Sequence, residues 1–392
     1  MGAPTARLGQ AAFLVLRLVD LLLPSQSGSA PDVFLYQASA TERYTRELDV
    51  ESVEKAHLLA LIKGARDAFA TQKVAMAVPS LFAYGHFLEE VSQYPEALDV
   101  LDTLLIVGGE GLSPADAIAT TLRIARVNRK LSNFDEAYRW YERASSAALL
   151  AGDAHAEMAS RLGRVNIVWA RGNLAEAGYR ALIADARAAH QVGHEASATQ
   201  GLAVTISQRG RPAEAIPYAW RAYELFDDVA NKVRTLIGLG IMLRDVGDLA
   251  AAEQALRASL AAANGTEHSE NAVLELMECA SQRGDRFGYA RWREEARRRE
   301  SRYLPSMRVD FFLKQGVAER RFGNVARSDA LLETALELAQ KHKLHEYVFR
   351  IERMKDDLRE SNRLHPVEAA EVGSDESLDA VRAGLRELAT ID

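Results

Sequence analysis

The sequence predicts an all-α fold, a solenoid of seven or eight antiparallel helix hairpins, and two observations carry this prediction. A short phrase recurs every 37 to 41 residues, as in "RGNLAEA" (171–177) and "RGRPAEA" (209–215). Small residues recur in register with that phrase. A near-constant period in this range is typical of helical repeats, which escape the limit of about 250 to 300 residues on a single hydrophobic core.

The glycine of the phrase marks the turn of each hairpin. Glycine takes the left-handed conformation that ends a first helix, and an aspartate or asparagine directly after it can cap the second helix. These capping candidates are Asn133, Asn173, Asp248, Asp285 and Asn324. The marker positions are Glu51, Ser92, Ser132, Gly172, Gly210, Gly247, Gly284 and Gly323.

Two further positions are expected to lie where the helices of a hairpin cross, because antiparallel helices approach closely only where side chains are small. Five residues after the marker stand Ala56, Ala97, Ala137, Ala177, Ala215 and Ala252, with Tyr289 and Ser328 in the last two copies. Seven residues before the marker stand Tyr44, Gly85, Ala125, Val165, Ala203, Gly240, Met277 and Gly316.

These residues resemble the tetratricopeptide repeat over roughly residues 31 to 345. The resemblance implies a right-handed superhelical solenoid in which the first helices line a concave groove that binds peptides. The period exceeds the usual 34 residues of that family. In this respect the chain is similar to the divergent long-period repeats of bacterial regulators, including the peptide-sensing Rap-type proteins.

The two ends fall outside the repeat, which gives three expected regions: 1–30, 31–362 and 363–392. Residues 1–30 hold an amphipathic helix, "AAFLVLRLVDLLLP", that is too short for a membrane span and has charges within it. We expect it to cap the fold or to form a homodimer contact; a secretory signal and a membrane-surface anchor are the alternatives. Residues 363–392 hold an acidic linker and a last amphipathic helix, interpreted as a cap on the solenoid or as a tail that docks into a groove.

Composition narrows the class of partner. The net charge of −7 provides no overall basic field for a nucleic-acid backbone or an anionic membrane. The single cysteine, Cys279, excludes an internal disulfide and favours a reducing, cytoplasmic location, with the thiol packed in an apolar stretch. We expect a protein or peptide partner and no nucleic acid.

The sequence holds no motif for catalysis or for a cofactor. It contains no phosphate-binding loop, and the pair His190 and His194 is interrupted by Gly193 at an expected helix end. We therefore expect no enzyme activity, no cofactor and no metal. The arginine-rich run 291–302 is interpreted as a solvated helix with i, i+4 ion pairs, with a partner's acidic patch and RNA as the alternatives.

The resemblance implies where a ligand would bind, at positions three, six and ten before the markers. An arginine fork binds carboxylates, an amide side chain holds a peptide backbone, and tryptophan contributes buried area. Simple pairing of the arginines with neighbouring acids is the alternative, and some of the ten-before residues are expected in the core. The candidates, which include two further cations of the same basic helix, are Phe82, His86, Arg123, Arg126, Arg129, Lys130, Asn166, Trp169, Gln200, Val204, Ile237, Ile241 and Arg244.

The resulting functional hypothesis is a non-enzymatic scaffold or adaptor that binds a peptide or protein segment in the groove. The alternative is a Rap-like regulator whose superhelix changes on binding a small peptide. A divergent enzyme or an RNA binder forms the third class.

Overall fold

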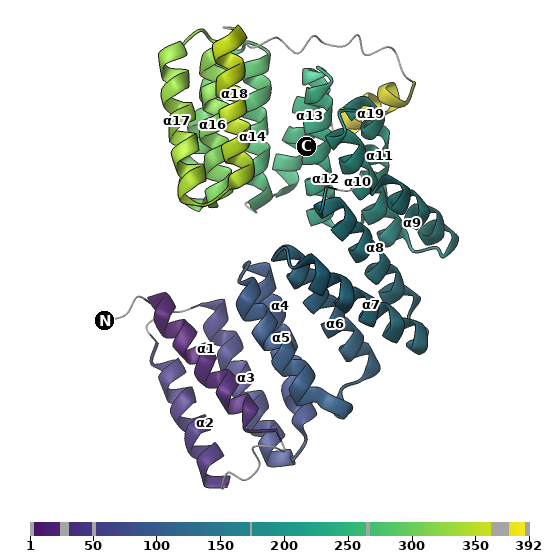
Figure 1. The fold of residues 1–392 in the computed structure, drawn as a ribbon, viewed down its shortest axis with the longest axis vertical. Helices are drawn as coiled ribbons and strands as arrows, with labels where there is room; N and C mark the ends of the chain where they lie inside the picture. The colour runs from purple at the N-terminus through teal and green to yellow at the C-terminus, as the bar shows by residue number, and fades with distance from the viewer. Residues whose placement is uncertain are drawn as a thin grey trace. The chain divides into compact units, whose positions relative to one another are not determined.

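The computed structural model describes residues 4–23, 31–48, 52–172, 175–263, 267–361 and 376–388. Regular structure over these residues is entirely helical, as the sequence predicts. The chain divides into two compact units, Met1–Asn173 (unit 1) and Leu174–Asp392 (unit 2). In Figure 1 unit 1 runs from purple to dark blue-green and unit 2 from there to yellow.

Unit 1 is a stack of antiparallel helix pairs preceded by one extra helix. Consecutive helices pack on each other within the pairs α2 with α3, α4 with α5 and α6 with α7. Its helices are α1 (Pro4–Asp20), α2 (Pro31–Arg46), α3 (Val53–Thr71), α4 (Val78–Glu90), α5 (Tyr94–Gly108), α6 (Pro114–Lys130), α7 (Phe134–Ala151) and α8 (Ala154–Ala170).

Unit 2 continues the same arrangement, with hairpins α10–α11, α12–α13, α14–α15 and α16–α17. Its helices are α9 (Glu176–Ala188), α10 (Val192–Gln208), α11 (Pro212–Leu225), α12 (Val229–Asp245), α13 (Leu249–Ala263), α14 (Glu267–Gln282), α15 (Arg286–Arg299), α16 (Pro305–Arg321), α17 (Val325–Lys341), α18 (His345–Ser361) and α19 (Glu376–Leu388). The unit boundary falls in the turn marked by Gly172. The described residues thus form seven hairpins that lie within one unit or the other.

The predicted turns are confirmed at every marker that the structure describes. Gly172, Gly210, Gly247, Gly284 and Gly323 all have a positive φ, between 74° and 86°. Ser92 and Ser132 take the same left-handed conformation, with φ of 61° and 62°, although their side chains disfavour it. The marker Glu51 lies outside the described residues.

Helices of a hairpin cross at the small residues, as expected. A Cβ added to Gly85 would lie 3.0 Å from Leu101, one added to Gly240 would lie 2.7 Å from Leu256, and one added to Gly316 would lie 2.9 Å from Leu332. In each case the leucine is nine residues after the marker. The alanines five after the marker, Ala97, Ala137, Ala215 and Ala252, are completely buried.

Two alanines predicted at crossings are exposed instead, Ala56 and Ala177. In the second case the second helix begins later than the repeat predicts. Because α9 begins at Glu176, the buried positions of its first turns are Ala175 and Tyr179. The prediction was therefore wrong in register at these two copies.

Only the aspartates among the predicted caps that the structure describes act through their side chains. The Asp248 and Asp285 carboxylates accept the backbone N–H groups of Ala251 and Gly288, at 3.1 and 2.9 Å. Asn324 stands at the cap position but its amide donates to Glu319, five residues back in the first helix, at 2.7 Å. Asn133 likewise donates to Asn128, and Asn173 lies outside the described residues.

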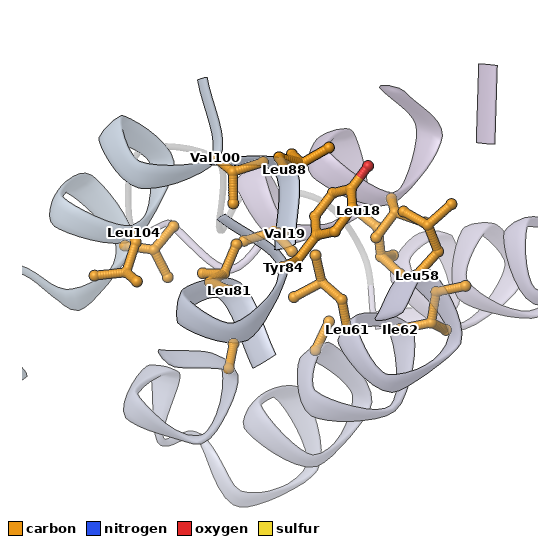
Figure 2. Packing of buried hydrophobic residues seen from close by; sticks show 14 of the residues in the cluster. Leu18, Val19, Leu58, Leu61, Ile62, Leu81, Tyr84, Leu88, Val100 and Leu104 are labelled. Carbon is orange, nitrogen blue, oxygen red and sulfur yellow. The ribbon is translucent and has the colours of Figure 1, made fainter. Parts of the chain in front are cut away.

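The N-terminal helix α1 is part of the core of unit 1. It contacts α2, α3 and α5, and Figure 2 shows Leu18 and Val19 among the buried side chains of the neighbouring helices, including Leu61 and Tyr84. The side chains of Phe13 and Leu14 remain exposed. No helix in the described ranges has the length and apolar character needed to cross a membrane.

The C-terminal helix α19 lies on the second helices α11 and α13, in the middle of unit 2. Leu378, Val381 and Leu385 form its buried stripe. Most of the expected acidic linker, residues 362–375, lies outside the described residues.

Candidate functional site

The predicted basic stripe of unit 1 lies on α6 and contacts α4. The Arg123 and Arg126 guanidinium groups both donate to the Glu89 carboxylate, at 2.8 and 2.7 Å. Arg123 also stacks over the Phe82 ring, 4.9 Å from its centroid. Burial, then the charge of Arg126, lower the pKa of Arg123. The alternative of pairing with neighbouring acids is thus realised for these two arginines.

Other candidates of unit 1 surround this pair. The His86 ring lies 3.4 Å from the Glu90 carboxylate on the same helix. Arg129 is half-buried at the end of α6 beside the buried Tyr141, whose pKa is raised by its burial. Lys130 is exposed, and Asn166 and Trp169 lie half-buried on α8. Among the cations of α6, the exposed ones are Arg126 and Lys130.

In unit 2 the candidates form a polar and apolar strip on α10 and α12. The Gln200 amide donates to Thr235 at 3.0 Å and accepts from Arg234 at 3.1 Å, which fixes its orientation. Val204 and Ile241 are partly exposed. Ile237 is only 8% exposed and belongs to the core, as expected for some of the ten-before residues.

Arg244 belongs to a charge network that crosses three first helices, α12, α14 and α16. Its guanidinium bonds to Glu275 of α14 and to Asp245. The Glu275 carboxylate in turn accepts from the Lys314 ammonium of α16 at 2.8 Å, and Lys314 also pairs with Asp310. The order along the network is therefore Asp245, Arg244, Glu275, Lys314 and Asp310.

The network holds Glu275 in its ionised form despite its burial. Burial acts to raise the pKa of this carboxyl group, but the charges of Lys314 and Arg244 outweigh it and lower the pKa. For Lys314 burial acts downward, and the Asp310 and Glu275 carboxylates raise its pKa. The ammonium and the carboxylate thus stabilise each other's charged form.

A second set of charges lies beside this network. The Arg321 guanidinium donates to the Glu278 carboxylate at 2.7 Å and to the Ser281 hydroxyl at 2.6 Å. The other carboxylate oxygen of Glu278, Oε2, is buried and accepts no hydrogen bond from the described residues. This oxygen is therefore a hydrogen-bond acceptor buried among the first helices.

Sequence reasoning missed Glu275, Glu278 and Lys314. The positions three and six before the marker Gly284 are Ser281 and Glu278, but this copy of the repeat is degenerate and supplied no candidates. Glu275 and Lys314 stand nine before their markers, a position outside the transferred set. Taking the positions three and six before the marker in every hairpin identifies Glu278. Glu275 and Lys314 are identified only in the structure, where their charged groups face each other.

Three other features of the sequence have structural roles: the arginine-rich run, the histidine pair and the single cysteine. In the run 291–302, Arg297 and Arg298 pair with Glu294, while Arg299 pairs with Glu295 and Glu270. His190 has a left-handed backbone before α10, whereas His194 is buried inside that helix. Burial raises the pKa of the Cys279 thiol to about 12.

Comparisons with known proteins place this fold. The sequence matches no protein-family model. A comparison with curated proteins finds no match. The structure is similar to solved helical-repeat structures, although sequence identity to the three described next is 12% or less.

Three of these structures illustrate the similarity. The apo form of the quorum sensor NprR from B. thuringiensis has a TM-score of 0.57 and 12% identity, over 83% of this chain and 97% of that one. A Rap conjugation gene regulator of the plasmid pLS20, in complex with the Phr* peptide, has a TM-score of 0.58 and 10% identity, over 86% and 98%. A Rap protein complexed with Competence and Sporulation Factor has a TM-score of 0.52 and 12% identity, over 87% and 99%.

These similarities confirm the class of fold. The chain has a tetratricopeptide-like helical-repeat fold, similar to that of the Rap and NprR structures over most of its length. At this level of identity the likeness defines the fold alone.

Proposed function

We propose that this chain is a non-enzymatic peptide-binding protein whose ligand lies against the first helices of its hairpins. The observation that carries the proposal is the strip on α10, α12, α14 and α16. On α10 and α12 lie the oriented Gln200 amide and the partly exposed Val204 and Ile241 side chains. The charge network continues this strip across α12, α14 and α16. Such a strip offers a peptide both backbone hydrogen bonds and apolar contact.

The charge network supports a binding role because apolar side chains could stabilise the same space at least as well. Placing ions in a protein interior is costly, and a buried ion pair is often no better for stability than a well-packed apolar pair. Glu275 and Lys314 are nevertheless held on facing first helices, and Glu278 keeps a buried oxygen with no donor among the described residues. Buried charges of this kind are concentrated at functional sites.

The structural neighbours support the same reading. Two of the Rap structures contain Phr* peptide or Competence and Sporulation Factor, and an NprR structure contains its cognate peptide NprX. We infer a peptide with an apolar stretch for Val204 and Ile241, and we infer that Arg126 and Lys130 of unit 1 take an acidic segment. The cytoplasm stays our proposed location, since a single buried thiol suits a reducing compartment.

The test is selection of short peptides from a random display library on the immobilised chain, followed by calorimetry of the enriched sequences. We expect micromolar binding that weakens about tenfold or more in the double variant Val204→Glu, Ile241→Glu, because each aliphatic contact contributes roughly 1.5 kcal/mol or more. Val325→Glu, at an exposed valine that begins the second helix α17, is the matched control. The proposal fails if no peptide is enriched, or if enriched peptides bind the double variant as tightly as the wild type.

A second candidate function is the Rap-like switch, in which peptide binding changes the superhelix. Solved structures of this fold exist both without and with a peptide, which motivates the comparison. Small-angle scattering of the chain with and without a selected peptide distinguishes the two functions. A change in radius of gyration supports the regulator, and unchanged curves support the scaffold or adaptor.

The proposed homodimer contact through α1 stays a prediction. Phe13 and Leu14 are the exposed apolar side chains on which it depends.

A further inference from the structure

The C-terminal helix α19 shows what the second-helix face of unit 2 can bind. It packs on both α11 and α13, and we call the surface that it covers there the first groove. Its Arg382 guanidinium donates to Asp248 at 2.7 Å. Its Gly384 faces the Trp220 ring so closely that an added Cβ would lie 2.2 Å from a ring carbon.

The repeat predicts an equivalent groove one hairpin further on, and the structure contains it. Trp220 stands ten residues after its marker, and the same position in the next hairpin is Arg257. Asp248 directly follows its marker, and its equivalent is Asp285. Arg257 and Asp285 both line a cavity of about 260 Å³ between α13 and α15, which we call the second groove.

The second groove combines an apolar surface with an excess of positive charge. Its floor contains Leu276 and Ala280 of α14. Phe287 of α15 lines it with 92% of its side chain exposed. The Trp292 ring has the Arg257 and Arg291 guanidinium groups 5.6 and 4.8 Å from its centroid.

Its acids are already engaged. The Glu253 carboxylate pairs with both Arg257 and Arg283. The Asp285 carboxylate accepts the backbone N–H of Gly288 as the cap of α15. Arg291 lies in the same groove, and within the described ranges it is stacked on Trp292 and paired with no carboxylate. Three arginines thus face two acids, and an acidic ligand complements the groove.

We propose that the second groove is a docking site for an acidic amphipathic helix of a partner protein. The helix places its aliphatic stripe on Phe287 and Trp292, in the manner of α19 in the first groove. A carboxylate of the helix occupies the position of Gly384 and meets Arg257 and Arg291. The proposal is independent of peptide binding on the first helices.

The test uses a probe that the equivalence of the two grooves defines. It is the labelled synthetic peptide of residues 376–388 with Gly384→Glu, added to the full chain and followed by fluorescence anisotropy. In the first groove the new side chain would collide with Trp220, whereas in the second groove it faces Arg257. We expect saturable binding, weakened about tenfold or more by the chain variant Arg257→Glu, Arg291→Glu.

Two controls and one further variant make the result specific. The peptide with Gly384→Lys has similar bulk and opposite charge, and it should bind about tenfold more weakly or worse. The chain variant Arg139→Glu, Arg221→Glu reverses two exposed arginines elsewhere and should bind the Glu peptide like the wild type. Phe287→Ser removes the exposed ring without breaking an ion pair and should weaken binding.

Several outcomes would overturn the proposal. Absence of saturable binding, equal affinity for the two peptides, or binding that survives both the arginine reversal and Phe287→Ser each excludes this site for an acidic helix. Binding of a short single-stranded RNA that the arginine reversal abolishes, with no binding of the peptide, would assign the groove to nucleic acid instead.

Discussion

Replacing Glu275 by glutamine tests whether the charge network on the first helices holds α12, α14 and α16 together. The substitution keeps the shape of the side chain but removes a negative charge that contacts Arg244 and Lys314. The Glu275 residue is only 8% exposed, so the two cations lose their counterion in a poorly solvated place. Breaking a buried pair from one side costs about 3–5 kcal/mol.

That magnitude gives a measurable change in local opening. Because about 1.4 kcal/mol corresponds to a tenfold change in an equilibrium constant, Glu275→Gln should reduce amide protection by roughly two to three and a half orders of magnitude. The affected peptides are those that cover α12, α14 and α16, and the assay is hydrogen exchange followed by mass spectrometry. The control is Glu224→Gln, whose carboxylate forms an exposed pair with Arg221 at 3.5 Å and contributes about 0–1 kcal/mol.

The effect should also depend on pH in a fixed direction. The pKa of Glu275 is lower in the folded chain than in the unfolded chain, where it is about 4.3. The carboxylate therefore stabilises the fold above about pH 4.3, and this contribution is lost as the pH falls through the lower, folded pKa. Wild type and Glu275→Gln should converge in acid. Equal protection of the two proteins at pH 7, or a difference that persists unchanged into acid, would refute the reasoning.

Two further predictions concern glycine. Gly163→Ala should destabilise unit 1 by roughly 1–3 kcal/mol and lower its melting temperature, because the new Cβ would lie 2.2 Å from the Tyr141 ring. The control Gly238→Ala, which has open space around the new Cβ, should instead raise the melting temperature. A fall in both melting temperatures, or in neither, contradicts this. Ser132→Gly should raise the free energy of unfolding in urea by about 0.5–1 kcal/mol, because Ser132 has a φ of 62°. The reverse change Gly210→Ser should lower it. A lower free energy of unfolding in Ser132→Gly would show that the serine side chain has another role.

The turns and crossings could be predicted because they are local. A left-handed residue between two helices needs glycine or tolerates serine, and close helices need a small residue, so both recur at fixed offsets in the sequence. Register failed where a helix begins late, as α9 does at Glu176. In "RGRPAEA" the first helical residue is Pro212, which favours a helix start, and α11 keeps the expected register; "RGNLAEA" has no proline at that position.

The site was harder to predict because it depends on contacts between hairpins. The transferred positions identified Arg244 but not Glu275 or Lys314, which give Arg244 its partner and its buried setting. Likewise the pairing of Arg123 and Arg126 with Glu89 joins residues 34 and 37 apart. Charges separated by one repeat can be matched from sequence only when the facing positions are already known.

The docking of α19 has a consequence for the order in which the chain is made. Arg382 and Asp248 are 134 residues apart, whereas the hairpins close within one repeat. At a synthesis rate of roughly 5–20 residues per second, Asp248 is made about 7 to 27 s before Arg382. During that interval a nascent chain presents the Trp220 surface to chaperones and to helices of other chains. Ribosome-bound chains that end before residue 376 are therefore the state in which this surface is open.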